Sequence, residues 1–348
     1  MEDNEGIGVS GPAKREGHHI FVDELARFAE QTRQPRIGPI TRRVAAPLGV
    51  VVRGRDGVGR RTVARALAGA GVEVVDDLAA ADVDVVVVAE VLKPEDRAAL
   101  AAADRPTLTV LNKADLAGFG VGGPMAIAQR RAARYRAVTG VPTVPMVGLP
   151  ATAVLDDELI GALQAATEPA DLSSTDSFVE ADHRLPRAVR IRLLDTLDLF
   201  GIARGVLAIR RAAEPTSLPA LMWRLSHIDR VVAQLAATGV EVAYRWVRSA
   251  VVELRALAVA SGDERLTEFV ASDDAVIAAM AAAVDVVHRA GLTVDPSDHA
   301  VAHLRRAVHW HRYSRGPVDG LHRACGADIS RGSLRLLRRV QPAAGAVR

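Results

Sequence analysis

The chain has 348 residues, of which 49% are hydrophobic and 25% are charged, and its formal net charge is +2 at pH 7. This length predicts two domains and suffices for a sizeable buried core. A single cysteine excludes an intramolecular disulfide framework. No run of about twenty uncharged apolar residues is present, which argues against a membrane-spanning helix.

Charge is distributed unevenly along the chain. Residues 151–182 contain eight Asp or Glu and no Lys or Arg, whereas residues 299–348 contain ten Arg and two Asp. This asymmetry indicates either an internal electrostatic contact or an anionic partner for the C-terminal end. The single cysteine, and the lack of a signal-peptide pattern in residues 1–19, predict a cytoplasmic location.

The N-terminal region shows no alternation of strands and helices. Residues 1–19 are polar, charged and rich in glycine without an apolar period, which predicts a disordered tail. Residues 20–45 are predicted to form a helix and a linker. Apolar side chains at helical spacing place the helix over 20–34, and the Pro- and Gly-containing stretch after it predicts a break.

Residues 46–166 alternate short apolar runs with helical segments. The predicted strands cover residues 48–52, 72–75, 83–88, 106–111 and 141–147, and the predicted helices cover residues 59–70, 94–103 and 125–138. This alternation predicts an α/β fold with a doubly wound, mostly parallel sheet. Ligands of such sheets bind at the carboxyl ends of the strands, so the loops there are the expected place of a ligand site.

The chain leaves this pattern after residue 166. Residues 167–184 are acidic and rich in Ser, which predicts a linker. From residue 185 to residue 348 helical periodicity dominates and predicts an α-helical domain with a basic C-terminal end. Its predicted helices include residues 240–260, 273–290, 297–312 and 331–340.

The tetrapeptide Asn112-Lys113-Ala114-Asp115 directly follows the predicted strand over residues 106–111. A strand that ends in Asn-Lys-x-Asp resembles the guanine-reading element of P-loop GTPases. An Asp carboxylate accepts both N1–H and N2–H of guanine, a donor pair that adenine lacks. Asp115 would therefore select the base, the Lys113 stem would lie over it, and the Asn112 amide would tie neighbouring loops together. The alternative is an ordinary strand-to-helix turn, in which Asn and Asp are common caps.

A glycine-rich loop lies between the first predicted strand and the first predicted helix, where a phosphate-binding loop belongs. The candidate phosphate contacts in this loop are Gly54, Gly57, Gly59, Arg60, Arg61 and Thr62. The spacing from Gly54 to Gly59 matches the P-loop pattern. Arg60 and Arg61, however, stand where that family has Lys and the Mg²⁺-binding Ser or Thr, and Thr62 comes one residue late. A plain glycine-rich turn is the alternative.

The resemblance implies roles for two further positions. Asp76 stands where the family has Asp-x-x-Gly and would hold a Mg²⁺-bound water, with a plain strand-end turn as the alternative. Ala79 replaces the Gly of that motif, and Ala80 replaces the catalytic Gln after it. Gly148 follows the last predicted strand and would supply a backbone N–H behind the guanine. The short gap before residue 72 leaves no room for switch I.

The resemblance covers about residues 46–150 and implies a truncated P-loop NTPase-like domain that binds GTP or GDP. Hydrolysis relies on Mg²⁺ bridging the phosphates, a positioned water and a charge-stabilising residue. Because the Mg²⁺-binding Ser or Thr, switch I and the Gln are missing, we expect a regulatory protein with weak or no GTP hydrolysis. It would be a slow GTPase at most, and its need for Mg²⁺ is open. The alternative is a structural or interaction protein that retains a GTPase-like scaffold without binding nucleotide.

An N-terminal helix, a GTPase-like domain and a long helical domain resemble the bacterial dynamin-like GTPases in layout. That resemblance implies a homologous, active GTPase as the protein partner and contact with a membrane. Trp310, Tyr313 and the Arg residues around them would face an anionic membrane, with a plain interaction face as the alternative. His299 and His303 share a helix face, which invites a metal interpretation without a complete ligand set. Nucleic acid is not expected, because no known binding module is present.

Overall fold

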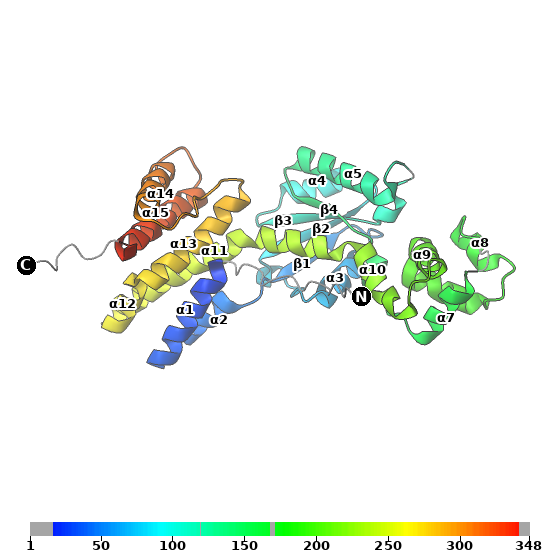
Figure 1. The fold of residues 1–348 in the computed structure, drawn as a ribbon, viewed down its shortest axis with the longest axis horizontal. Helices are drawn as coiled ribbons and strands as arrows, with labels where there is room; N and C mark the ends of the chain where they lie inside the picture. The colour runs from blue at the N-terminus through cyan, green and yellow to red at the C-terminus, as the bar shows by residue number, and fades with distance from the viewer. Residues whose placement is uncertain (1–16, 119, 168–170, 341–348) are drawn as a thin grey trace, which may run out of the picture. The chain divides into compact units, whose positions relative to one another are not determined.

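The structure, a computed structural model, describes residues 17–118, 120–167 and 171–340. The chain divides into two compact units. The sheet unit comprises Pro47–Gly239, and the helical unit comprises Met1–Ala46 together with Val240–Arg348. One long helix, α11 (Ile228–Ser261), contributes residues to both units (Figure 1).

The sheet unit is built on four parallel strands in the order β1-β2-β3-β4. The strands are β1 (Val50–Gly54), β2 (Val83–Ala89), β3 (Thr107–Asn112) and β4 (Thr143–Pro145). Nearly every residue of β2 and β3 is buried, as expected for apolar and β-branched runs in a parallel sheet covered on both faces. The predicted α/β class with a parallel sheet is confirmed.

The predicted strand over residues 72–75 forms only one ladder position. Val74 makes an isolated parallel bridge with Val50, supported by a hydrogen bond of 2.9 Å from the Val75 N–H to the Val50 carbonyl. The chain then turns away, and the Asp77 side chain caps a short 3₁₀ turn by accepting from the Ala79 N–H. The prediction of a full strand here is therefore wrong.

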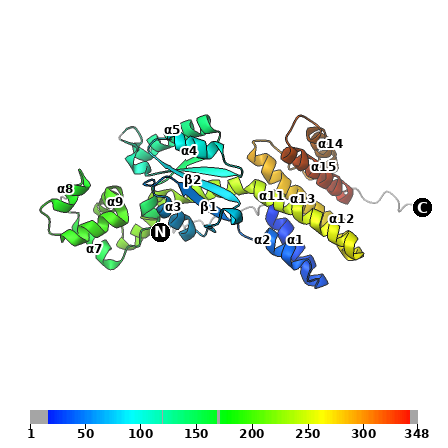
Figure 2. The ribbon, with the colours of Figure 1, turned by 180° about the vertical axis from the view of Figure 1, so that it is seen from behind.

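Helices pack on both sides of the sheet. They are α3 (Arg60–Gly69), α4 (Pro94–Ala101), α5 (Gly123–Thr139) and the single turn α6 (Gly148–Ala151). Leu100 of α4 and Ala132 of α5 pack with Val88 and Leu111 of the sheet. Both views show α3 on the opposite side from α4 and α5 (Figures 1 and 2).

Four further helices of the sheet unit form an apolar cluster of their own. They are α7 (Asp157–Ala165), α8 (Thr175–Glu180), α9 (Arg187–Arg210) and α10 (Leu218–Ser226). Leu163, Phe178, Leu193 and Met222 are almost completely buried in this cluster. The predicted linker over residues 167–184 thus contains a short helix anchored by a buried aromatic ring.

The helical unit packs around α11 from residue 240 onward. Its other helices are α1 (Gly17–Thr32), α2 (Gly38–Ala45), α12 (Glu264–Ala271), α13 (Asp273–Arg289), α14 (Ala300–Ser314) and α15 (Gly320–Val340). Phe21, Tyr244 and Trp310 are buried in one core. Gly17 allows α1 to approach α13 closely, because a Cβ there would collide with the backbone at Ala281. The prediction of a largely helical C-terminal region is confirmed.

The boundary between the two units does not fall in the acidic stretch over residues 167–184. Residues 185–239 group with the sheet, and the helices within residues 20–45 group with the chain after residue 240. Of the tail predicted over residues 1–19, residues 1–16 lie outside the described residues. Residues 17–19 form the start of α1. None of the described helices is long and apolar enough to cross a membrane.

Candidate functional site

A cavity of about 410 Å³ lies where the loops after β1, β3 and β4 meet. This volume falls within the roughly 300–1,000 Å³ that is typical of small-molecule sites. The predicted site residues that line this cavity are Gly57, Gly59, Arg60, Arg61, Thr62, Asn112, Lys113, Asp115 and Gly148. Gly54 closes β1 behind the loop, and Asp76 lines a different hollow. The topology therefore brings the two predicted motifs to one place.

Asn112 joins the walls of this cavity. Its side chain is 3% exposed, and its Nδ2 donates to the Val58 carbonyl at 2.9 Å. Its Oδ1 accepts from the Gly148 N–H, also at 2.9 Å. The prediction that this amide ties neighbouring loops together is confirmed. The same bond occupies the Gly148 N–H, which was expected to face a guanine base and is instead bound to Asn112.

Gly59 is required by this bridge. It adopts a φ of 84°, in the left-handed region that favours glycine, and forms the N-cap of α3. A Cβ at Gly59 would collide with the Asn112 side-chain nitrogen. Gly57 also has a positive φ, 81°, but a Cβ there would meet nothing within 4 Å. The close approach of loop and amide thus explains one of these two glycines sterically.

Lys113 and Asp115 enter the cavity from a short 3₁₀ turn after β3. Lys113 is exposed, and its φ of 58° turns the chain sharply. Asp115 is half-buried. Burial is the largest influence on the Asp115 carboxyl and raises its pKa, repulsion from Asp198 raises the pKa further, and Lys113 opposes the shift. The carboxylate is therefore held at a higher free energy than one in water, ready to accept hydrogen bonds.

Asp198 is the site residue that sequence reasoning missed. It lines the same cavity from within α9, where its φ of 57° and ψ of 171° interrupt the helix. This region is strained for a residue other than glycine and costs on the order of 1–3 kcal/mol. Its Oδ1 accepts from the Leu199 N–H at 2.7 Å. The residues on either side of Asp198 are Leu197 and Leu199, and the helix-weakening residue Gly201 comes three positions after it, so the sequence does not point to Asp198 itself.

The glycine-rich end of the cavity is basic. Arg60 and Arg61 are exposed in the first turn of α3 and make no ion pair with any described residue. Arg55 also lines the cavity, but its Nε donates to the buried Asp96 carboxylate at 2.8 Å. The free N–H groups of a helix N-terminus add to the positive potential. Two unpaired guanidinium groups are thus available to an anion.

The expected Mg²⁺ role of Asp76 does not fit its surroundings. Asp76 is exposed and lines a separate hollow whose other charged members are Arg53, Arg60 and Arg61. Among the described residues, no group of three or more His, Cys, Asp or Glu side chains is arranged to hold a metal ion. Mg²⁺ prefers carboxylate, carbonyl and water oxygens, and guanidinium groups compete with it.

Trp310, His303 and His299 have structural roles within the helical unit. Trp310 is 2% exposed and packs edge-on against the Tyr313 ring. His303 is buried, with its Nδ1 2.6 Å from Arg306 Nη2 and its Nε2 3.0 Å from the Asp298 carboxylate. His299 caps α14 by accepting from the Ala302 N–H. Trp310 is therefore not available to a membrane surface.

Comparison of the chain with protein-family models, curated proteins and solved structures finds no match. The fold stands as an α/β unit with a four-stranded parallel sheet, followed by a largely helical region. The cavity carries unpaired Arg60 and Arg61 at one end and the carboxylates of Asp115 and Asp198 at the other. Such a cavity suits a ligand that is anionic at one end and rich in N–H donors at the other.

Proposed function

We propose that the sheet unit binds a guanine nucleotide and that the protein is a nucleotide-dependent regulator with weak or no GTP hydrolysis. The observation that carries the proposal is that Asp115 shares one cavity with the glycine-rich loop, with Asn112 bonded across it. This arrangement favours a degenerate P-loop GTPase domain as the family of the sheet unit.

The base end supports guanine over adenine. Guanine presents N1–H and an amino group along one edge, and the Asp115 carboxylate can accept from both. Adenine presents a lone pair at N1, which would face the same carboxylate and be repelled. Sites built around such hydrogen bonds reject the wrong ligand by about ten-thousand-fold. Asp198 adds negative potential at this end and strengthens the preference for a donor-rich edge.

The phosphate end supports binding more than turnover. Arg60 and Arg61 are free to bind phosphate oxygens in a two-pronged manner, and α3 begins beside them. The Mg²⁺-binding Ser or Thr is replaced by Arg61, and the Asp76 carboxylate is in another hollow. Phosphoryl transfer without a bridging metal and a positioned water is slow. Retention of the nucleotide is therefore the expected outcome.

The packing of α9 beside the cavity supports a regulatory role. Leu197 is buried in the α7–α10 cluster, Asp198 lines the cavity, and Phe200 packs against the cluster formed by the sheet with α4 and α5. A ligand that displaces Asp198 would therefore move α9 relative to the sheet. A protein partner would read this change, and the layout of the chain implies a homologous, active GTPase as that partner.

Thermal unfolding with and without GDP tests the proposal. GDP at a hundred times its Kd should stabilise the folded protein by about 2.7 kcal/mol. Asp115→Ala should abolish the effect, whereas Asp104→Ala, which removes an exposed carboxylate outside the cavity, should retain it. Stabilisation that persists in Asp115→Ala would show that GDP binds without base recognition by Asp115 and would contradict the guanine assignment. No stabilisation of the wild type would favour an interaction protein that binds no nucleotide. Phosphate release from GTP at the rate of an intact GTPase would contradict weak turnover.

A further inference from the structure

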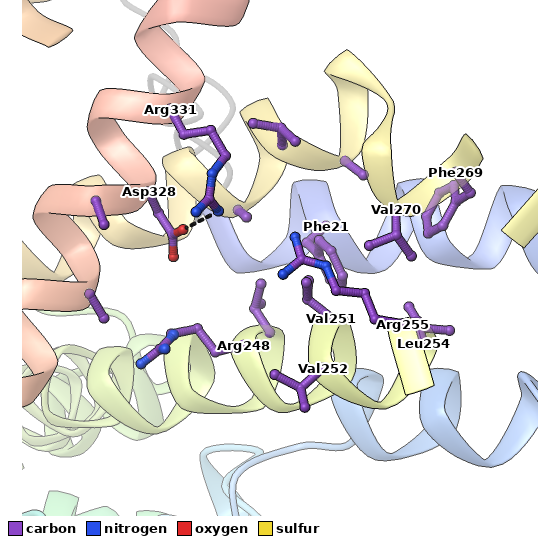
Figure 3. Close-up of a pocket in the computed structure, with 16 residues that line it drawn as sticks. Phe21, Arg248, Val251, Val252, Leu254, Arg255, Phe269, Val270, Asp328 and Arg331 are labelled. Carbon is purple, nitrogen blue, oxygen red and sulfur yellow. Dashed lines mark hydrogen bonds and ion pairs between the residues drawn. The ribbon is translucent and has the colours of Figure 1, made fainter. Parts of the chain in front are cut away.

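The helical unit contains a second cavity, of about 160 Å³, between α1, α11, α12, α13 and α15 (Figure 3). Its apolar lining includes Phe21, Val251, Leu254, Val270 and Val276. An apolar protein cavity of about 150 Å³ stays dry and takes up benzene. The space therefore matches one aromatic ring or an equally compact branched alkyl group.

The rim of this cavity carries unbalanced positive charge. Arg248, Arg255 and Arg331 line it with Asp328 as the only acidic residue, so three positive charges and one negative charge leave a local charge of +2. Asp328 is already engaged, because it accepts from the Tyr244 hydroxyl at 2.7 Å and from Arg331 Nη1 at 3.0 Å. Arg248 and Arg255 make no ion pair with any described residue.

The side chains converge from facing helices. Figure 3 shows Arg255 of α11 and Arg331 of α15 extending into the space between the helices. Arg331 gives only its Nη1 to Asp328, which leaves other N–H groups of its guanidinium free. Two guanidinium groups on opposite sides of an apolar hole can bind one anionic group while the hole takes the apolar part of the same molecule.

We infer that this cavity binds a small organic anion in which a carboxylate is attached to a single aromatic ring or a compact branched alkyl group. Arg255 and Arg331 bind the carboxylate, and the ring packs against Phe21 and Val251. The size of the cavity disfavours nucleotides and long acyl chains. Every lining residue belongs to the helical unit, so the inference does not depend on guanine binding in the sheet unit.

Fluorine NMR of para-fluorobenzoate with the full chain tests this inference. We expect saturable line broadening with the wild type and at least about tenfold weaker binding of para-fluorobenzyl alcohol, which keeps the ring without the charge. Trifluoroacetate, which keeps the charge without the ring, should also bind at least about tenfold more weakly. The full chain is used throughout, and circular dichroism checks that each variant is folded.

Two variants separate the charge from the apolar space. Arg255→Gln should weaken fluorobenzoate binding by about tenfold, whereas Arg245→Gln on the exposed side of the same helix should not change it. Ala279→Leu should fill the cavity and abolish binding. If Ala279→Leu does not fold, the comparison of Arg255→Gln with Arg245→Gln still tests the inference. Equal binding of the alcohol, unchanged binding by Arg255→Gln, or no binding by the wild type would each overturn the inference.

Discussion

Asn112→Ala should separate the loops that form the walls of the cavity in the sheet unit. The side chain is buried and makes two hydrogen bonds of 2.9 Å, to the Val58 carbonyl and from the Gly148 N–H. Leaving a buried hydrogen-bonding group unpaired costs about 1–3 kcal/mol, so two such groups cost about 2–6 kcal/mol. Gly148 lines the cavity, so water can reach its N–H, and we therefore expect the lower end, about 2 kcal/mol.

Amide hydrogen exchange at Gly148 measures this cost locally. A loss of about 2 kcal/mol should speed its exchange by about thirtyfold. Asn112→Asp keeps an acceptor for Gly148 but places a carboxylate against the Val58 carbonyl, so Gly148 should stay protected while the glycine-rich loop loosens. Thr109→Val on the same strand is the control, because the Thr109 hydroxyl is buried without a hydrogen-bond partner in the described structure. Unchanged exchange in Asn112→Ala would refute the bridging role.

Three other changes probe the same cavity. Asp115→Asn should shift preference from guanosine to xanthosine diphosphate in competition binding, because a carboxamide offers a donor for the xanthine O2 and an acceptor for its N1–H. The pKa of Asp115 is raised by burial and by Asp198, so GDP affinity should fall on acidification at a higher pH than for a free Asp. Asp198→Asn removes the repulsion and lowers that pKa, and affinity measured from about pH 4 to about pH 7 should then fall at lower pH. If the two affinity profiles coincide, Asp198 does not act on Asp115. Gly59→Ala should lower both melting temperature and GDP affinity more than Gly57→Ala, since both glycines have positive φ but only Gly59 faces Asn112.

The parts of the site that follow from contiguous residues were predictable. Asn112 and Gly59 belong to short motifs at the ends of strands, and parallel strands bring such ends to one edge of the sheet. Asp198 was not predictable, because its approach to the cavity depends on how α9 packs against the sheet. The alternation of strands and helices likewise predicted the α/β class.

Long-range packing also explains the incorrect expectations. Trp310 lies among arginines in the sequence, which suggested an exposed basic and aromatic face, yet the ring belongs to the core. Arg306 is itself 6% exposed, with its guanidinium bonded to the Ser333 hydroxyl and the Asp295 carbonyl. The charged residues of α14 therefore do not all lie on its solvent-exposed side, and the pattern of charge in the sequence did not predict that side. Neither did the acidic composition of residues 167–184 mark the boundary between the two units, since contacts between distant segments define those units.

Calorimetric titration of the full chain with GDP and with ADP tests the guanine assignment most directly. The Asp115 carboxylate predicts that GDP binds and that ADP binds about a thousandfold to ten-thousandfold more weakly. Equal affinity for the two nucleotides, or no heat with either, would contradict guanine recognition by the sheet unit.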